Sequence, residues 1–309
     1  MKIAFLFSGQ GAQFPGMFKE LYDSETVVKN IFDKAAGVLD RSIADICFSG
    51  TQEELNLTHN TQPCVLAADI AAGILLKSRG IVPDAVAGFS LGEYAALACA
   101  GAITIEDAFK LIQLRADAMQ EAVPVGTGAM AAVIGTDSKV VEEICAQVSE
   151  GYVIAANYNS PVQTVISGTT EGIDHAVSKM EEQGLKVMRL AVSAPFHCRL
   201  MEPAAKRLEQ ELKNVSFKNV DLPVFMNVDG KKHQAAAEYP GLLVNQAMNP
   251  VQWVETLENM YRDGIDTFIE CGPGKALSGF VKKTLKGVSI YRVENKKTLD
   301  IVLTALKKD

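Results

Sequence analysis

The sequence contains no apolar run that is long enough to cross a membrane. Its best apolar stretch, residues 65–76, is interrupted by Asp69 and falls far short of the ~20 residues that a membrane-spanning helix needs. Near the N-terminus, the apolar run 3–7 turns polar at Ser8, which makes it too short for the core of a signal peptide. We therefore expect a cytoplasmic protein with no membrane partner.

Cysteine pairs and a surplus of positive charge are also absent. The six cysteines are too far apart for a CxxC metal or redox pair, and we expect them to be reduced and buried: Cys47, Cys64, Cys99, Cys145, Cys198 and Cys271. The 30 Lys and Arg residues are outnumbered by 37 Asp and Glu residues, and the resulting net charge of −7 argues against a nucleic-acid-binding face. A local basic patch for an acidic partner is still compatible with these counts.

What is present is typical of a soluble globular protein: 309 residues, of which 48% are hydrophobic and 22% are charged. Outside the middle of the chain, short apolar segments alternate with helical patterns, which predicts a parallel sheet covered by helices in an α/β domain. The expected strands are 2–7, 85–87, 224–227 and 267–271, and the expected helices are 17–39, 62–79, 92–100 and 105–122.

The middle of the chain has a different order of strand and helix patterns. Strand patterns at 128–134, 152–157, 163–167 and 186–191 enclose helical patterns at 138–149 and 170–183. This β-α-β-β-α-β order predicts a ferredoxin-like unit inserted into the larger domain. We therefore expect a large domain made of residues 1–124 and 194–309, and a small domain made of residues 125–193.

The pentapeptide Gly88-Phe89-Ser90-Leu91-Gly92 lies between an expected strand and an expected helix. This is the setting of a nucleophile elbow, in which a serine on a strained turn needs glycine neighbours. The helix N-terminus beneath Ser90 would favour developing negative charge. A tight turn whose serine only caps the helix is the alternative.

A serine nucleophile needs a base, and the sequence offers four histidines. His197 lies at the junction between the small domain and a new helix, where α/β folds present site residues, whereas His59, His175 and His233 lie in a polar loop, on a helix and in a turn. No acidic residue stands out as a third member, and a backbone carbonyl could orient the imidazole instead. A structural or surface histidine is the alternative for His197.

Arg115 lies on the apolar face of helix 105–122, among Ala108, Leu111, Ile112 and Met119. A guanidinium group in such a place binds a carboxylate through its planar fork. That carboxylate could belong to a substrate or to a protein Asp or Glu, and a side chain that reaches back to water is a third alternative.

The loop at 8–13 follows the first strand and contains two glycines. It is not a dinucleotide fingerprint, because residue 14 is Phe where GxGxxG requires Gly, and Gly274-Lys275 is not a P-loop. The loop either donates a backbone N–H to an oxyanion or is a plain turn.

Taken together, these motifs closely resemble the malonyl-CoA:acyl carrier protein transacylases of type II fatty acid synthesis. The resemblance covers the whole chain through FSGQGAQ at 7–13, GFSLGEYAAL at 88–97, QLRADAMQEAVP at 113–124, NYNSP at 157–161, SAPFHCRLM at 193–201, NPVQW at 249–253 and ECGPGKAL at 270–277. It implies a large hydrolase-like α/β domain with a ferredoxin-like insert, which agrees with the pattern above.

The resemblance also implies roles for individual residues. Ser90 would be the malonylated nucleophile and His197 its base, with the imidazole held by the main-chain carbonyl of Gln246. The N–H groups of Gln10 and Leu91 would form the oxyanion hole. Arg115 would bind the malonyl carboxylate, and the substrate cleft would be lined by Met119, Asn157, Asn159 and Phe196.

Two positions near the expected site concern selectivity. Phe89 stands where the family usually has His. Because this neighbour of the serine packs near the acyl pocket, the difference affects which acyl groups the site prefers. Phe196 is similar to the residue of malonyl-selective acyltransferases, where an aromatic ring leaves no room for an α-methyl group. One methyl group is worth only ~1–3 kcal/mol of discrimination, so leakage is expected.

The implied partners are malonyl-CoA and phosphopantetheinylated acyl carrier protein, with no metal or redox cofactor, and we expect a monomer. Lys275, Lys282, Lys283 and Lys286 could form a carrier-docking patch or simply a solvated helix face. The alternatives are a malonyltransferase that serves a polyketide synthase and a serine thioesterase or hydrolase. A non-enzymatic binding module would be expected to lack Ser90 or His197.

Overall fold

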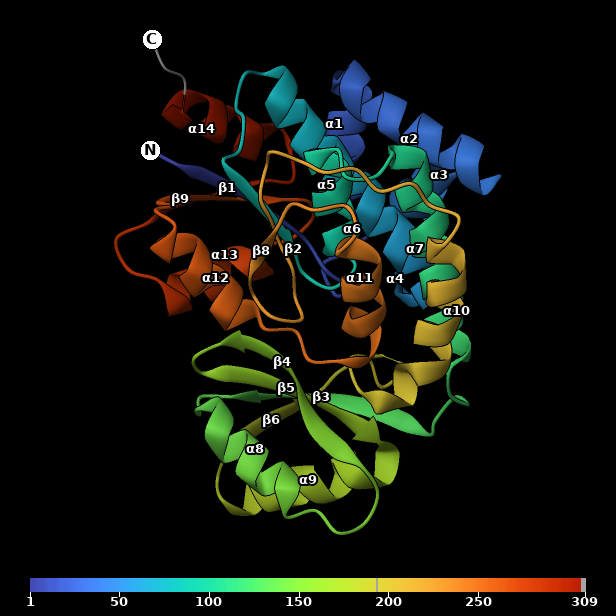
Figure 1. Cartoon of the computed structure of the whole chain (residues 1–309), viewed down its shortest axis with the longest axis vertical. Coiled ribbons are helices and arrows are strands. Elements are labelled where there is room, and N and C mark those ends of the chain that lie inside the picture. The colour runs from blue at the N-terminus through green and yellow to red at the C-terminus, as the bar shows by residue number, and fades with distance from the viewer. Residues whose placement is uncertain (193, 307–309) are drawn as a thin grey trace.

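The larger of two sheets is built almost entirely from parallel strands (Figure 1). In this computed structural model, which describes residues 1–192 and 194–306, its strand order is β10-β9-β1-β2-β7-β8, and only β8 runs antiparallel to its neighbour. The strands are β1 (Ile3–Phe7), β2 (Ala85–Gly88), β7 (Val224–Phe225), β8 (Lys232–His233), β9 (Thr267–Cys271) and β10 (Ser289–Val293).

Helices cover both faces of this sheet, because the central strands are apolar on both sides. In β1, the side chains of Ile3, Phe5 and Phe7 join one core, and those of Ala4 and Leu6 join the other. The helices are α1 (Lys19–Ser24), α2 (Thr26–Leu39), α3 (Ile43–Ser49), α4 (Gln52–Asn56), α5 (Thr58–Ser78), α6 (Gly92–Ala100), α7 (Ile105–Glu121), η1 (Arg199–Met201), α10 (Glu202–Leu212), α11 (Tyr239–Met248), α12 (Trp253–Arg262), α13 (Ala276–Thr284) and α14 (Lys296–Leu306).

The second sheet is antiparallel, with the strand order β4-β5-β3-β6. Its elements follow the predicted β-α-β-β-α-β order: β3 (Gly128–Ile134), α8 (Ser138–Ala146), β4 (Val153–Ser160), β5 (Gln163–Thr169), α9 (Thr170–Glu182) and β6 (Lys186–Arg189). Ala131 and Val133 of β3 face α8 and α9, while Met130 and Ala132 face the larger part of the chain. The α/β fold class with an inserted ferredoxin-like unit is therefore confirmed.

Backbone hydrogen bonds join β4 of the second sheet to the segment between α11 and α12. Val251 donates to the carbonyl of Ala156 (2.9 Å) and accepts from the N–H of Tyr158 (2.9 Å). Ser8 and Phe89, which directly follow β1 and β2, line one pocket together with Asn157 of β4, so the second sheet lies beside the C-terminal ends of these two strands. The domain limits at 125 and 193 stay a prediction, and Ser193 lies outside the described residues.

Some predicted boundaries were wrong. The helix predicted at 17–39 is interrupted at Glu25, whose extended backbone separates α1 from α2. The helix predicted to begin at 62 begins at Thr58 and contains Pro63. Pro63 has no N–H to donate to the carbonyl of His59, and that carbonyl instead accepts from Nη2 of Arg41 (2.6 Å).

All six cysteines are buried and unpaired. Burial raises the pKa of Cys99 to about 11 and that of Cys145 to about 12. In the described part of the chain, no helix is long and apolar enough to span a membrane.

Candidate active site

The turn at Ser90 connects β2 to α6 and depends on two glycines. The backbone of Ser90 is left-handed (φ 54°), a strained conformation for a residue with a Cβ atom. A Cβ atom on Gly88 would lie 1.9 Å from the carbonyl of Gly92, and one on Gly92 would lie 2.5 Å from the carbonyl oxygen of Phe7. The strand and the helix therefore meet closely enough to lift the Ser90 side chain into a pocket between the two sheets.

Ser90 and His197 are in direct contact in this pocket. Ser90 Oγ lies 2.7 Å from Nε2 of His197, and Nδ1 of His197 lies 2.9 Å from the main-chain oxygen of Gln246. Because a carbonyl only accepts hydrogen bonds, Nδ1 carries the proton and Nε2 is free to accept from the serine. Burial and the positive charge of Arg115 lower the pKa of His197 to about 4, so the imidazole is a neutral base at physiological pH.

The other three histidines lie outside this pocket. His175 is close to Glu150 on the second sheet's helical side, and His233 lies between Asp229 and Glu238. The sequence argument for His197 thus selected the one histidine that reaches Ser90 among the described residues.

Arg115 is almost completely buried, with 2% of its surface exposed, and its guanidinium points at Ser90. Nη2 donates to Ser90 Oγ (3.0 Å) and to Oε1 of Gln246 (2.9 Å), and Nη1 donates to Oε1 of Gln62 (2.8 Å). Within residues 1–192 and 194–306, no carboxylate forms an ion pair with it, and its Nε has no partner. The alternatives of a structural ion pair and of a side chain that reaches water are therefore wrong.

Two main-chain donors face the same space. The residues Gln10 and Leu91 both line the pocket, and no hydrogen bond in the described structure uses the N–H of either residue. Free N–H groups at the start of α6 and in the loop after β1 can together hold an oxyanion formed next to Ser90.

The remaining predicted cleft residues line the pocket as well: Met119, Asn157, Asn159 and Phe196. Oδ1 of Asn159 is buried without a hydrogen-bond partner, so a polar group is available to a ligand there. Phe89 also lines the pocket, and its ring packs against Trp253 (5.3 Å between centroids) and Phe280 (6.2 Å). The aromatic residue before the serine therefore has a packing role as well as a place in the pocket.

Sequence reasoning missed a polar layer under the serine turn. Asn227 accepts from the N–H of Ser90 (2.7 Å) and donates to the carbonyl of Gly88 (2.7 Å). The side-chain amide of Gln246 donates to the carbonyl of Ser90 (2.6 Å) and to Oε2 of Glu93 (2.8 Å). A single acid in the otherwise apolar segment of α6, and an Asn at the end of an expected strand, were the available signals.

Comparisons with known proteins agree with this geometry. The family model described as "Acyl transferase domain" matches residues 4–309. The malonyl CoA-acyl carrier protein transacylase of Bacillus subtilis (strain 168) is 42% identical over 311 aligned positions, which cover 100% of this chain and 98% of that protein. The corresponding Escherichia coli (strain K12) protein is 41% identical, with coverages of 91% and 92%.

Solved structures are equally similar. The malonyl CoA-acyl carrier protein transacylase of Coxiella burnetii superposes with a TM-score of 0.96 at 40% identity, covering 100% of this chain and 98% of that one. A malonyl-transacylase in complex with a type II PKS acyl-carrier protein also gives a TM-score of 0.96, at 39% identity, with coverages of 99% and 100%. The chain therefore belongs to the acyl transferase domain family and, within it, to the malonyl CoA-acyl carrier protein transacylases.

Proposed function

We propose that this chain transfers a malonyl group from malonyl-CoA to the phosphopantetheine thiol of an acyl carrier protein, through an ester on Ser90. The observation that carries this proposal is the buried guanidinium of Arg115, which lies 3.0 Å from Ser90 Oγ and has no protein carboxylate as its partner in the described structure. A carboxylate on the acyl group can supply that partner, whereas a simple esterase has no use for a buried cation.

The first half of the reaction forms the ester. Ser90 Oγ attacks the thioester carbonyl while Nε2 of His197 takes the proton of the serine hydroxyl. The N–H groups of Gln10 and Leu91 hold the oxyanion, and each donor lowers the barrier by ~3 kcal/mol. The imidazolium then gives the proton to the sulfur of CoA, which leaves as the thiol. The carbonyl of Gln246 keeps the imidazole in the reactive tautomer throughout.

The second half reverses these steps on the thiol of the carrier protein. Arg115 fixes the malonyl carboxylate so that the ester carbonyl faces the incoming sulfur, which is mainly a gain in proximity. This proposed ping-pong chemistry uses no metal or redox cofactor. The side chains of Met119 and Phe196 limit the space for the acyl group, and Asn157 and Asn159 offer polar contacts along the cleft.

The carrier docks, in this proposal, on a basic surface beside the pocket. Lys275, Lys282, Lys283 and Lys286 are exposed on and around α13, and Ala276, Leu277 and Phe280 of the same helix line the pocket. An acidic carrier would be attracted to this surface despite the acidic net charge of the chain. We place the chain in the cytoplasm as a monomer, and its six buried thiols suit a reducing compartment.

A polyketide carrier protein is the second candidate acceptor. The solved complex of a malonyl-transacylase with a type II PKS acyl-carrier protein, at 39% identity to this chain, favours it specifically. The chemistry on Ser90 is the same for both carriers. Transfer rates to a fatty-acid carrier and to a polyketide carrier, measured side by side, decide between them.

Intact-mass spectrometry after brief mixing with malonyl-CoA, acetyl-CoA or methylmalonyl-CoA tests the proposal. We expect a malonyl adduct on the wild-type protein and none on Ser90→Ala. Arg115→Ala should lose the malonyl adduct and keep or gain the acetyl adduct. Arg41→Ala is a matched control, because Arg41 is also hydrogen-bonded and partly buried but lies outside the pocket. Hydrolysis of simple thioesters without any malonyl adduct would instead establish a hydrolase.

A further inference from the structure

Glu93 is a buried carboxyl group that the proposed reaction does not use. It lies on α6 one turn after Ser90 and has no exposed surface. Oε1 accepts from the main-chain N–H of Asn227, and Oε2 accepts from the side-chain amide of Gln246 (2.8 Å). Across the described residues, no Lys, Arg or His forms an ion pair with it.

The amide of Gln246 connects Glu93 to the substrate side of the site. While its Nε2 donates to Glu93, its Oε1 accepts from Nη2 of Arg115 (2.9 Å). One buried cation and one buried carboxyl group are therefore separated by a single amide. Because the surroundings have a low dielectric constant, each group responds strongly to any charge added near the other.

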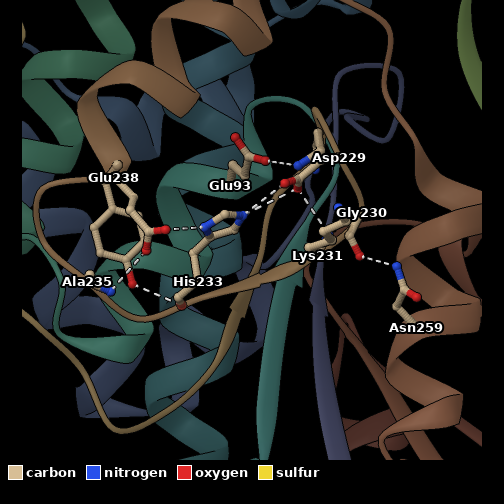
Figure 2. Close-up of polar contacts among 10 residues, drawn as sticks. Glu93, Asp229, Gly230, Lys231, His233, Ala235, Glu238 and Asn259 are labelled. Atoms are coloured by element: carbon tan, nitrogen blue, oxygen red, sulfur yellow. Dashed lines mark hydrogen bonds and ion pairs between the residues drawn. The ribbon is translucent and has the colours of Figure 1, made fainter.

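Few other charges face Glu93. Tyr94 and His197 lie close to Arg115 and are neutral at physiological pH, since burial raises the pKa of Tyr94 and lowers that of His197. Figure 2 shows Glu93 beside Asp229, whose carboxylate contacts His233 (3.1 Å), while His233 also contacts Glu238 (3.2 Å). Burial, opposed mainly by the hydrogen bond from Asn227 and the charge of Arg115, raises the pKa of Glu93 to about 8.

We propose that Glu93 is a positioning residue that takes up a proton from solvent when a malonyl carboxylate binds Arg115. This inference rests on the proposed function. In the free protein, Arg115 is the cation that stabilises an ionised Glu93. A bound malonyl carboxylate neutralises that cation, which leaves an ionised Glu93 as an uncompensated buried charge. Protonation of Glu93 removes that charge. The carboxylate of Glu93 and the malonyl carboxylate therefore compete for electrostatic stabilisation by the one guanidinium of Arg115.

The acyl transfer itself neither consumes nor releases a proton as long as the CoA thiol stays protonated, and any ionisation of that thiol is the same for malonyl-CoA and acetyl-CoA. Ser90 loses its hydrogen, the sulfur of CoA gains it, the thioester bond breaks and the serine ester bond forms. Proton uptake that accompanies malonyl-ester formation therefore reports on a titrating group of the protein. Since Glu93 is about half ionised at pH 8, we expect about half a proton per malonyl ester at pH 8 and about a tenth at pH 7.

Stopped-flow mixing with malonyl-CoA in weak buffer with a pH indicator measures this uptake, and intact mass measures the ester in the same sample. We expect about half a proton per ester at pH 8 for the wild type, and close to none for Glu93→Gln. Asp69→Asn, which removes an equally buried carboxyl group of α5, should leave the uptake unchanged. Acetyl-CoA, which brings no carboxylate, should give no uptake with any ester that forms and measures the proton release from the CoA thiol, which is subtracted.

A wild-type ester without uptake overturns the inference and leaves the proposed function intact, whereas no ester overturns the proposed function. Uptake that persists in Glu93→Gln assigns the proton to another group, and this result also overturns the inference. If Glu93→Gln does not form the ester, infrared difference spectra of the wild type with 13C-labelled malonyl-CoA show whether a carboxyl group of the protein becomes protonated. A protonated carboxyl band of the unlabelled protein should appear on malonylation, and its absence contradicts the inference.

The competition also predicts a kinetic signature that a structural role would not give. Above pH 8, the KM for malonyl-CoA should rise up to tenfold per pH unit, because binding of the malonyl carboxylate then requires the uptake of a proton by Glu93. In Glu93→Gln this rise should disappear. A wild-type KM that is flat between pH 7.5 and 9.5 would contradict the inference.

Discussion

Single residues decide the chemistry of this site through burial. Ser90, His197 and Arg115 were predictable because each breaks a local expectation: a serine flanked by glycines, a histidine at a domain junction and an arginine on an apolar face. Glu93 and Asn227 were not, because their importance depends on which distant backbone they reach, and that is set only by the tertiary fold.

The pH dependence of ester formation should reflect the buried imidazole. His197 acts as a base only when unprotonated, and its pKa is lowered to about 4. The single-turnover rate of malonyl-ester formation should therefore be flat from pH 7 to about 5 and fall tenfold per unit below about pH 4. Quenched-flow sampling with mass detection measures this rate, and circular dichroism shows whether the protein stays folded. An inflection near 6.5 would show a solvated histidine instead.

Gly272 lies in close contact with the buried side chain of Asp69, and its replacement tests this packing. Its backbone has φ 133°, and a Cβ atom there would lie 1.9 Å from Oδ1 of Asp69. Gly272→Ala should lower the free energy of unfolding by about 1–3 kcal/mol, measured by urea denaturation. Gly279→Ala on α13 is the matched control, since a Cβ atom there meets nothing within 4 Å and should cost no stability. Equal stabilities of the two variants would contradict this packing argument.

At the scale of elements, periodicity identified the long helices and the central strands, and it failed where burial is partial. Strand β10 is only half buried and β8 has two residues, so neither has a continuous apolar run. The break at Glu25 carries no proline or glycine, and nothing in the local sequence separates α1 from α2. Edge elements and helix breaks therefore needed the tertiary structure.

Helix α7 carries Arg115 and is capped by Thr104, whose side chain accepts from the N–H of Asp107 (3.0 Å). Thr104→Ala should lower the free energy of unfolding by about 1 kcal/mol, because it leaves an N–H at the helix start unpaired. Thr104→Ser keeps the hydroxyl oxygen and should retain most of that stability. Thermal and urea denaturation of both variants measure the difference, and equal losses would show that the hydroxyl does not act as a cap.

At the scale of the whole molecule, charge is segregated. Residues 275–306 contain seven Lys and Arg residues and two Asp and Glu residues, in a chain whose net charge is −7. The element order and the motifs predicted the two-sheet architecture, but not how the second sheet attaches to the rest of the chain, because that depends on hydrogen bonds between residues as distant as Ala156 and Val251.

The basic surface predicts an effect on the carrier alone. Lys282→Glu with Lys283→Glu should raise the KM for the acyl carrier protein several-fold, weaken its salt dependence and leave the KM for malonyl-CoA unchanged. Lys29→Glu is the control, because Lys29 lies on α2, away from α13 (Figure 1). Steady-state transfer assays at two ionic strengths provide the measurement. Unchanged carrier kinetics would show that this surface is merely solvated.

The burial of all six cysteines has a practical consequence for the study of this chemistry. With no exposed thiol of its own, the folded protein should react slowly with disulfide reagents such as Ellman's reagent. In the first half-reaction, run without carrier protein, the released CoA would then be the only fast-reacting thiol in the mixture. A colorimetric trace could follow the formation of the Ser90 ester continuously, and a single cysteine engineered at the surface would accept a spectroscopic label without competition.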